Sequence, residues 1–129
     1  MTDAALEEID HLGWCETRLH ELKAKPSYLN ISWYFLSFSI GAIAGLAGDK
    51  WSLGFVAETE KQVTKHLESH IKQLPKDDEK SSKILQQMVL DETAHATTAL
   101  EAGGTELPLF IRMIMGFMSK IMTHTSYYI

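Results

Sequence analysis

Apolar residues recur three and four positions apart along most of this chain, and this spacing predicts helices rather than strands. Five segments show it, at residues 4–23, 26–48, 50–74, 85–100 and 107–123. The first, third and fourth segments are amphipathic, with one apolar stripe each, whereas the last is apolar nearly all round. The pattern therefore predicts an all-α fold, a bundle of helices.

Residues that start or stop helices lie between these segments. Pro26 disfavours helical geometry in the residue before it, and Ser27 is placed to cap the second helix. Residues 75–82 are polar and form a short run, which is typical of a loop between antiparallel helices. We therefore expect a single helical domain over residues 1–129. The other predicted turn and cap residues are Gly48, Asp49, Gly103, Gly104 and Pro108.

The apolar stripe of segment 85–100 contains two side chains that a core normally excludes. Glu92 and His95 continue the helical spacing set by Leu85, Met88 and Ala99. Burying an unpartnered carboxylate costs several kcal/mol, so such groups are neutralised, paired or bound to a metal. A Glu-x-x-His pair on an inward helix face is how helical bundles hold two metal ions.

The same spacing occurs a second time, at Glu8 and His11, on the apolar stripe of segment 4–23 that also contains Leu12, Cys15, Leu19 and Leu22. A lone acid, Glu60, lies in the middle of a third stripe. Chance alone would give about half of one such pair in a chain of this composition, so the spacing by itself is weak evidence. The positions on three apolar stripes strengthen the metal hypothesis. The alternative is a set of buried acid–histidine hydrogen bonds without metal.

Composition narrows the function further. The chain is 45% hydrophobic and has a formal net charge of -5, without the Lys/Arg cluster that nucleic-acid binding needs. Its one cysteine, Cys15, excludes an internal disulfide and a cysteine-based zinc site. The first residues do not resemble a signal peptide. We therefore expect a reducing, cytoplasmic setting and no nucleic-acid partner.

Two segments are unusually apolar. Residues 26–48 form a run of 23 positions without a charge, which is long enough to consider a membrane span. Polar residues in the first half of this run favour a buried or membrane-surface helix instead. The last predicted helix carries four of the chain's methionines among isoleucine and phenylalanine. This helix belongs either to the core or to a surface that contacts membrane or an apolar substrate.

Four segments of the chain closely resemble the bacterial demethoxyubiquinone hydroxylases, a carboxylate-bridged di-iron family of the ferritin-like superfamily. The resemblance covers essentially all 129 residues. It implies a ferritin-like helical bundle and two ferrous ions as cofactors. The matching segments are EEIDHLGWCETRL, SFSIGAIAGLAGDKWSLGFVAETEKQVTKHLESHIKQLP, VLDETAHATTALEAGG and MTHTSYYI.

The resemblance also implies a ligand set. The family arranges its metal ligands as a lone Glu, a Glu-x-x-His, a second lone Glu and a second Glu-x-x-His. The family's first lone Glu would precede Glu8, and Glu7, Glu16 and Glu101 lie on the wrong helix faces or at the wrong heights to replace it. We therefore expect a chain that lacks the first ligand helix through truncation or a misplaced start. The positions that match the other ligands are Glu8, His11, Glu60, Glu92 and His95.

The resemblance implies oxygen-dependent hydroxylation of a demethoxyubiquinol, a polyprenyl benzoquinol, in ubiquinone synthesis. The expected partners are this quinol, molecular oxygen and the cytoplasmic face of the cell membrane, bound peripherally. Association with a second copy or with other ubiquinone-biosynthesis proteins stays open. Asp91 and His66 are candidates for orienting the ligands. Two alternatives remain: a ferroxidase-like or rubrerythrin-like iron protein, and a metal-free helical module that binds membranes.

Overall fold

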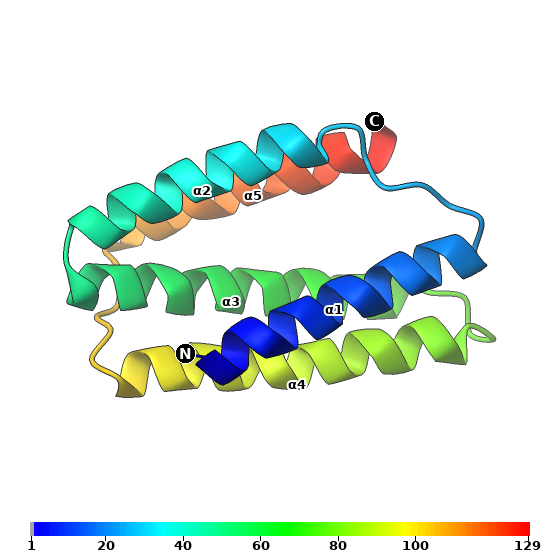
Figure 1. The fold of residues 1–129 in the computed structure, drawn as a ribbon, viewed down its shortest axis with the longest axis horizontal. Coiled ribbons are helices and arrows are strands. Elements are labelled where there is room, and N and C mark those ends of the chain that lie inside the picture. Colours follow the sequence, from blue (N-terminus) through cyan, green and yellow to red (C-terminus); the bar gives the residue numbers. More distant parts are fainter. Residues whose placement is uncertain (1) are drawn as a thin grey trace.

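A computed structural model describes residues 2–129, which form five helices and no strand (Figure 1). Each predicted segment corresponds to one helix, so the predicted all-α fold class is confirmed. The helices are α1 (Thr2–Glu21), α2 (Asn30–Leu46), α3 (Asp49–Gln73), α4 (Glu79–Glu101) and α5 (Leu109–Tyr128).

Three predicted boundaries were wrong, and side-chain hydrogen bonds explain the first two. Ser27 does not cap α2, because its Oγ accepts the amide of Leu29 at 3.1 Å and holds the chain in a turn before the helix. α4 begins earlier than the apolar stripe suggests, because the Asp78 carboxylate accepts the amide of Ser81 at 3.0 Å and caps the helix. α5 extends past Thr123 to Tyr128.

Helices α3 and α4 make the most extensive contact, and the other helices pack on this pair. Figure 1 shows α1 crossing in front of α3 and α4, while α2 and α5 lie on the other side of α3. The amide of Tyr28, just before α2, donates to the carbonyl of Ile129 at 3.5 Å, which brings the start of α2 to the end of α5. Gly48 adopts φ 103° in the tight turn from α2 to α3, a conformation that favours glycine.

The buried interior lies between α1, α3 and α4, and much of it is polar. Glu92 and His95 are buried as their stripe predicted, together with Met88 and Ala99. The predicted stripe of α1 was wrong at Leu12, which is 59% exposed. α1 packs mainly on α4, so only the narrow face around His11 is covered. The buried apolar residues are Ala57, Leu67, Met88, Ala96, Ala99 and Leu107.

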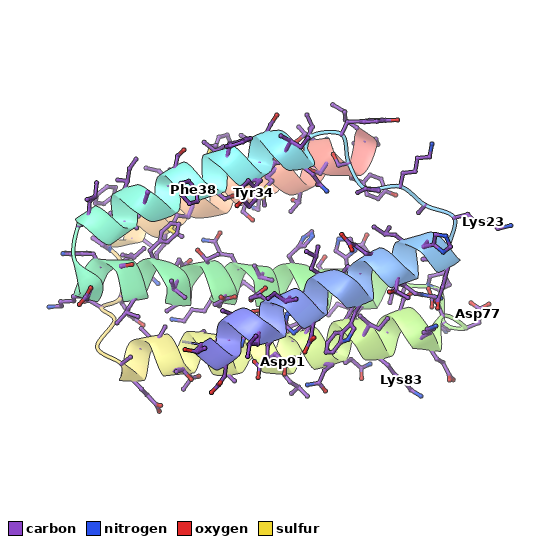
Figure 2. All side chains as sticks on the ribbon, in the orientation of Figure 1. Lys23, Tyr34, Phe38, Asp77, Lys83 and Asp91 are labelled. Atoms are coloured by element: carbon purple, nitrogen blue, oxygen red, sulfur yellow. The ribbon has the colours of Figure 1, made fainter. Side chains whose placement is uncertain are left out.

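Helices α2 and α5 form an apolar surface rather than a core, because neither contains a buried residue. Figure 2 labels two exposed aromatic side chains of α2, Tyr34 and Phe38. On α5 the exposed apolar side chains include Phe110, Ile114 and Phe117. Over residues 2–129, no helix combines the length and the apolar character that crossing a bilayer requires.

A close approach of two backbone segments, at Gly54, predicts the effect of one added methyl group. A Cβ on Gly54 of α3 would overlap the carbonyl oxygen of Thr105 and lie 3.2 Å from its carbonyl carbon. Gly54→Ala is therefore expected to lower the free energy of unfolding by about 2 kcal/mol or more, as overpacking does. The control is Gly13→Ala on the exposed side of α1, where an added Cβ has no atom within 4 Å. This substitution should raise the free energy of unfolding by about 0.5–1 kcal/mol, because alanine favours a helix more than glycine does. Denaturant unfolding of both variants checks this, and equal effects would contradict the packing described.

Candidate metal centre

Side chains from three helices meet at one point between α1, α3 and α4. Glu8 comes from α1, Glu60 from α3, and Glu92 and His95 from α4. One possible ligand atom from each of these four residues lies within 4.8 Å of the others. The sequence predicted that Glu60 and Glu92 point to a common centre, and the structure brings them together.

His11 of α1, the fifth predicted ligand, lies beside this group. Its Nδ1 is 3.2 Å from Oε1 of Glu92 and 3.9 Å from Oε2 of Glu8. Its Nε2 is 2.9 Å from Oδ2 of Asp91, which Figure 2 labels on α4 near its crossing with α1. With Nε2–H donating to Asp91, Nδ1 keeps a free lone pair, and this buried atom has no hydrogen-bond partner. The His11 ring thus presents a ligand atom toward the acids.

His95 of α4 has the reciprocal arrangement. Its Nε2 is 2.6 Å from Oε2 of Glu7, on α1. Its Nδ1 is 3.2 Å from Oε2 of Glu92 and 3.6 Å from Oε1 of Glu8. Each histidine therefore uses Nε2 to contact a carboxylate on the opposite helix and turns Nδ1 toward the same central acids.

This reciprocity follows from a repeated motif on antiparallel helices. Both Glu-x-x-His pairs are preceded by an acid, giving Glu7-Glu8 on α1 and Asp91-Glu92 on α4. Because the helices run antiparallel, the preceding acid of each motif reaches the histidine of the other. The sequence predicted this role for Asp91, whereas Glu7 was considered only as an unsuitable replacement for the missing ligand. The acid directly before each Glu-x-x-His is the sequence feature from which the role of Glu7 could have been predicted.

His66, the second expected outer residue, lies in different surroundings. Its ring meets that of His70 edge-on, with centroids 4.4 Å apart, and it lines grooves between α3 and α5. Burial and the nearby His70 lower the pKa of His66. His66 was expected to orient the ligands, but it lies at the surface between α3 and α5 instead.

Crowded carboxylates control the electrostatics of the centre. Burial, a hydrogen bond with Glu92 and the charges of Glu92 and Glu8 raise the pKa of Glu60 to about 9. Burial and the charge of Glu92 also raise the pKa of Glu8. Burial works against charging His95, but hydrogen bonds to Glu7 and Glu92 raise its pKa overall. The metal-free centre therefore retains protons that a bound cation would displace.

The donor set fits a divalent transition metal. Carboxylates are hard anionic ligands that bridge two ions, and a neutral imidazole nitrogen completes each coordination sphere. Three glutamates in mutual contact repel one another unless protons or cations neutralise them. The carboxylates behind His11 and His95 fix both imidazole rings, as the outer partners of metal-bound histidines do.

Glu60 makes the metal-free protein sensitive to alkaline pH. Its folded pKa of about 9 exceeds the reference value of 4.5, so the folded state holds a proton that the unfolded state releases. This contribution to stability is complete below about pH 4.5 and is lost as pH rises through about 9. Glu60→Gln should stabilise the protein progressively more with rising pH, in melting curves recorded with a chelator. Parallel pH profiles for the two proteins would contradict the burial of Glu60 among acids.

The reciprocal acid–histidine contacts predict an effect on metal affinity. Asp91→Asn and Glu7→Gln should each weaken divalent-metal binding by about 10–100-fold, because each frees one imidazole ring to rotate. Competition with a coloured chelator measures the affinity. The control Asp10→Asn removes the same charge from an exposed position on α1. An equal loss in this control would assign the effect to net charge rather than to ring position.

Comparison with known proteins identifies relatives of this chain. Residues 1–126 match the family model described as "Ubiquinone biosynthesis protein COQ7". A protein of Acinetobacter baylyi named 3-demethoxyubiquinol 3-hydroxylase is 62% identical over 129 residues, covering all of this chain and 61% of the relative. A protein of the same name from Polynucleobacter necessarius is 63% identical over 121 residues, which cover 94% of this chain and 58% of the relative. Another from Legionella pneumophila is 59% identical over 129 residues, which cover all of this chain and 61% of the relative.

The chain thus spans about three fifths of the length of these relatives. No solved structure matches it. The family match covers almost every residue and includes both Glu-x-x-His pairs and Glu60. It confirms the resemblance seen in the sequence and the ferritin-like class of the helical fold. The chain belongs to the COQ7 family of ubiquinone biosynthesis proteins.

Proposed function

We propose that this chain carries the metal centre of an oxygen-dependent hydroxylase that acts on a demethoxyubiquinol in ubiquinone biosynthesis. The observation that carries the proposal is the meeting of Glu8, Glu60, Glu92 and His95 within 4.8 Å of one another. The relatives named 3-demethoxyubiquinol 3-hydroxylase support the choice of substrate. Their name supports a hydroxylating monooxygenase over other uses of the same residues.

In this proposal five side chains hold two iron ions. Glu8, Glu60 and Glu92 supply carboxylate oxygens, and His11 and His95 supply Nδ1. When bound, ferrous iron supplies the electrons with which oxygen is activated for attack on the quinol ring. Asp91 and Glu7 each hold the Nε2 proton of a histidine, so that both imidazoles keep their lone pairs directed at the centre.

The polyprenyl substrate requires an apolar surface, and α2 and α5 offer one. Both helices expose aromatic and aliphatic side chains, and none of the chain's 17 Asp and Glu residues lies in either helix. Such helices bind in the plane of a membrane interface. The protein would therefore act as a peripheral membrane protein, with the quinol ring entering from the bilayer and its prenyl tail remaining in lipid.

A ferroxidase-like iron protein is the second candidate, and one observation favours it. The side chains of Glu7 and Glu8 are 48% and 50% exposed, so water and hydrated iron reach the centre from the α1 side. A storage or oxidation site uses an acidic, wet entry of this kind, whereas a hydroxylase needs an apolar route to its metals.

Product analysis separates the two candidates. The iron-loaded protein, given a reductant, isotopically labelled oxygen and a short-tailed demethoxyquinol, should yield a quinol that contains one labelled oxygen atom. Glu92→Gln should reduce turnover by at least about a hundredfold, because it removes an acid shared by both histidines. The control Glu68→Gln changes an exposed acid on α3 and should leave turnover unchanged.

Two results would decide against the hydroxylase. Iron oxidation without any labelled quinol would support the ferroxidase. Absence of bound iron, with the wild-type melting temperature unaffected by ferrous ions, would support a metal-free helical module whose acids and histidines serve only as buried hydrogen-bond partners.

A further inference from the structure

A groove between α3 and α5 collects positive charge beside apolar side chains. Its volume is 650 Å³, and it lies on a different side of α3 from the metal centre. Leu109, Met113 and Gly116 give one wall its apolar character. The basic side chains that line the groove are Lys61, Lys65, Arg112 and Lys120.

Most of this positive charge is not neutralised. Lys61 lies 3.8 Å from a carboxylate oxygen of Glu106, and the one acid in the groove, Glu58, accepts a hydrogen bond from Gln62. Among residues 2–129, the ion pairs do not include Lys65, Arg112 or Lys120. Three cations therefore remain available to an anion that enters the groove.

Arg112 supplies unpaired donors to the groove. Its Nε is closed off from solvent and has no hydrogen-bond partner. An anion in the groove therefore reaches Arg112 through the terminal guanidinium nitrogens, which are not enclosed and make no hydrogen bond among the described residues. A phosphate oxygen is an acceptor that arginine recognises well.

The groove opens onto the exposed apolar face of α5. Leu109 and Met113 line the groove and are each 66% exposed, so they belong to both surfaces. Phe110, Ile114 and Phe117 continue the apolar face along the helix. The juxtaposition suits a molecule with an anionic head and apolar tails.

The net charge of the chain indicates that an anionic surface binds only at the groove and not over the whole protein. The chain carries a formal charge of -5, so an anionic surface repels it as a whole. The cations of the groove act against this repulsion only where α5, which contains no acid, approaches the surface. A headgroup inside the groove would also fix which face of the protein meets the membrane.

We infer that the α3–α5 groove binds the phosphate of an anionic phospholipid and thereby seats α5 on the bilayer. Arg112 donates to the phosphate, Lys65 and Lys120 contribute charge, and the acyl chains follow the apolar face of α5. This inference deepens the proposed function, because it rests on a membrane-dissolved substrate and names the lipid that positions the enzyme.

Vesicle co-sedimentation tests the groove directly. The protein should bind vesicles of phosphatidylcholine that contain phosphatidylglycerol. The double variant Lys65→Gln/Lys120→Gln should weaken this binding by at least about tenfold, because each cation near an anionic membrane surface contributes on the order of fivefold in affinity. Arg112→Gln should also weaken it. The charge-matched control is Lys23→Gln/Lys83→Gln, in the turn just after α1 and on α4 (Figure 2), and should change binding by less than about twofold.

Three results would overturn the inference. They are equal losses in the test and control variants, equal binding to pure phosphatidylcholine, and displacement from vesicles by millimolar inorganic phosphate, which would indicate a site for a small free anion. Lys65 and Lys120 are exposed, so the double variant provides a test even if Arg112→Gln destabilises the fold. Turnover of a short-tailed quinol in solution should be unchanged in the two lysine double variants, which separates failure of the lipid groove from failure of the hydroxylase proposal.

Discussion

Repulsion among three glutamates at one point is the constraint on which the structure depends. Glu8, Glu60 and Glu92 come from three helices, and burial together with the two neighbouring acids raises the pKa of Glu60 to about 9. A fold selected only for stability would fill this position with apolar side chains, because a buried polar network rarely stabilises more than they do. The arrangement makes physical sense as a cation site, where the same repulsion becomes affinity.

The antiparallel pair of α1 and α4 organises the rest of the centre. Two copies of an acid-Glu-x-x-His motif face each other, so each helix supplies the carboxylate that orients the histidine of the other. Farther along, Arg18 of α1 bonds to Asp78 and Ser81 at the start of α4. α1 is thus held to α4 largely by polar contacts, and the position of the side chains that α1 directs at the centre depends on groups at both ends of the crossing.

Sequence periodicity predicted much of the fold and the centre, and its failures have physical causes. The stripe containing Glu92 and His95 predicted burial correctly, because α4 packs against both α1 and α3. The α1 stripe failed at Leu12, since periodicity does not reveal how wide a face the neighbouring helix covers. The Glu7–His95 contact and the α3–α5 groove depend on helix direction and crossing, which one-dimensional spacing does not contain.

Anomalous X-ray diffraction at the iron absorption edge, on crystals grown with ferrous iron and without oxygen, tests the central claim most directly. We expect iron within coordination distance of Glu8, Glu60 and Glu92, with Nδ1 of His11 and of His95 turned toward it. Iron found only at other histidines, such as the His66–His70 pair, with the three glutamates still in mutual contact and free of metal, would contradict the account.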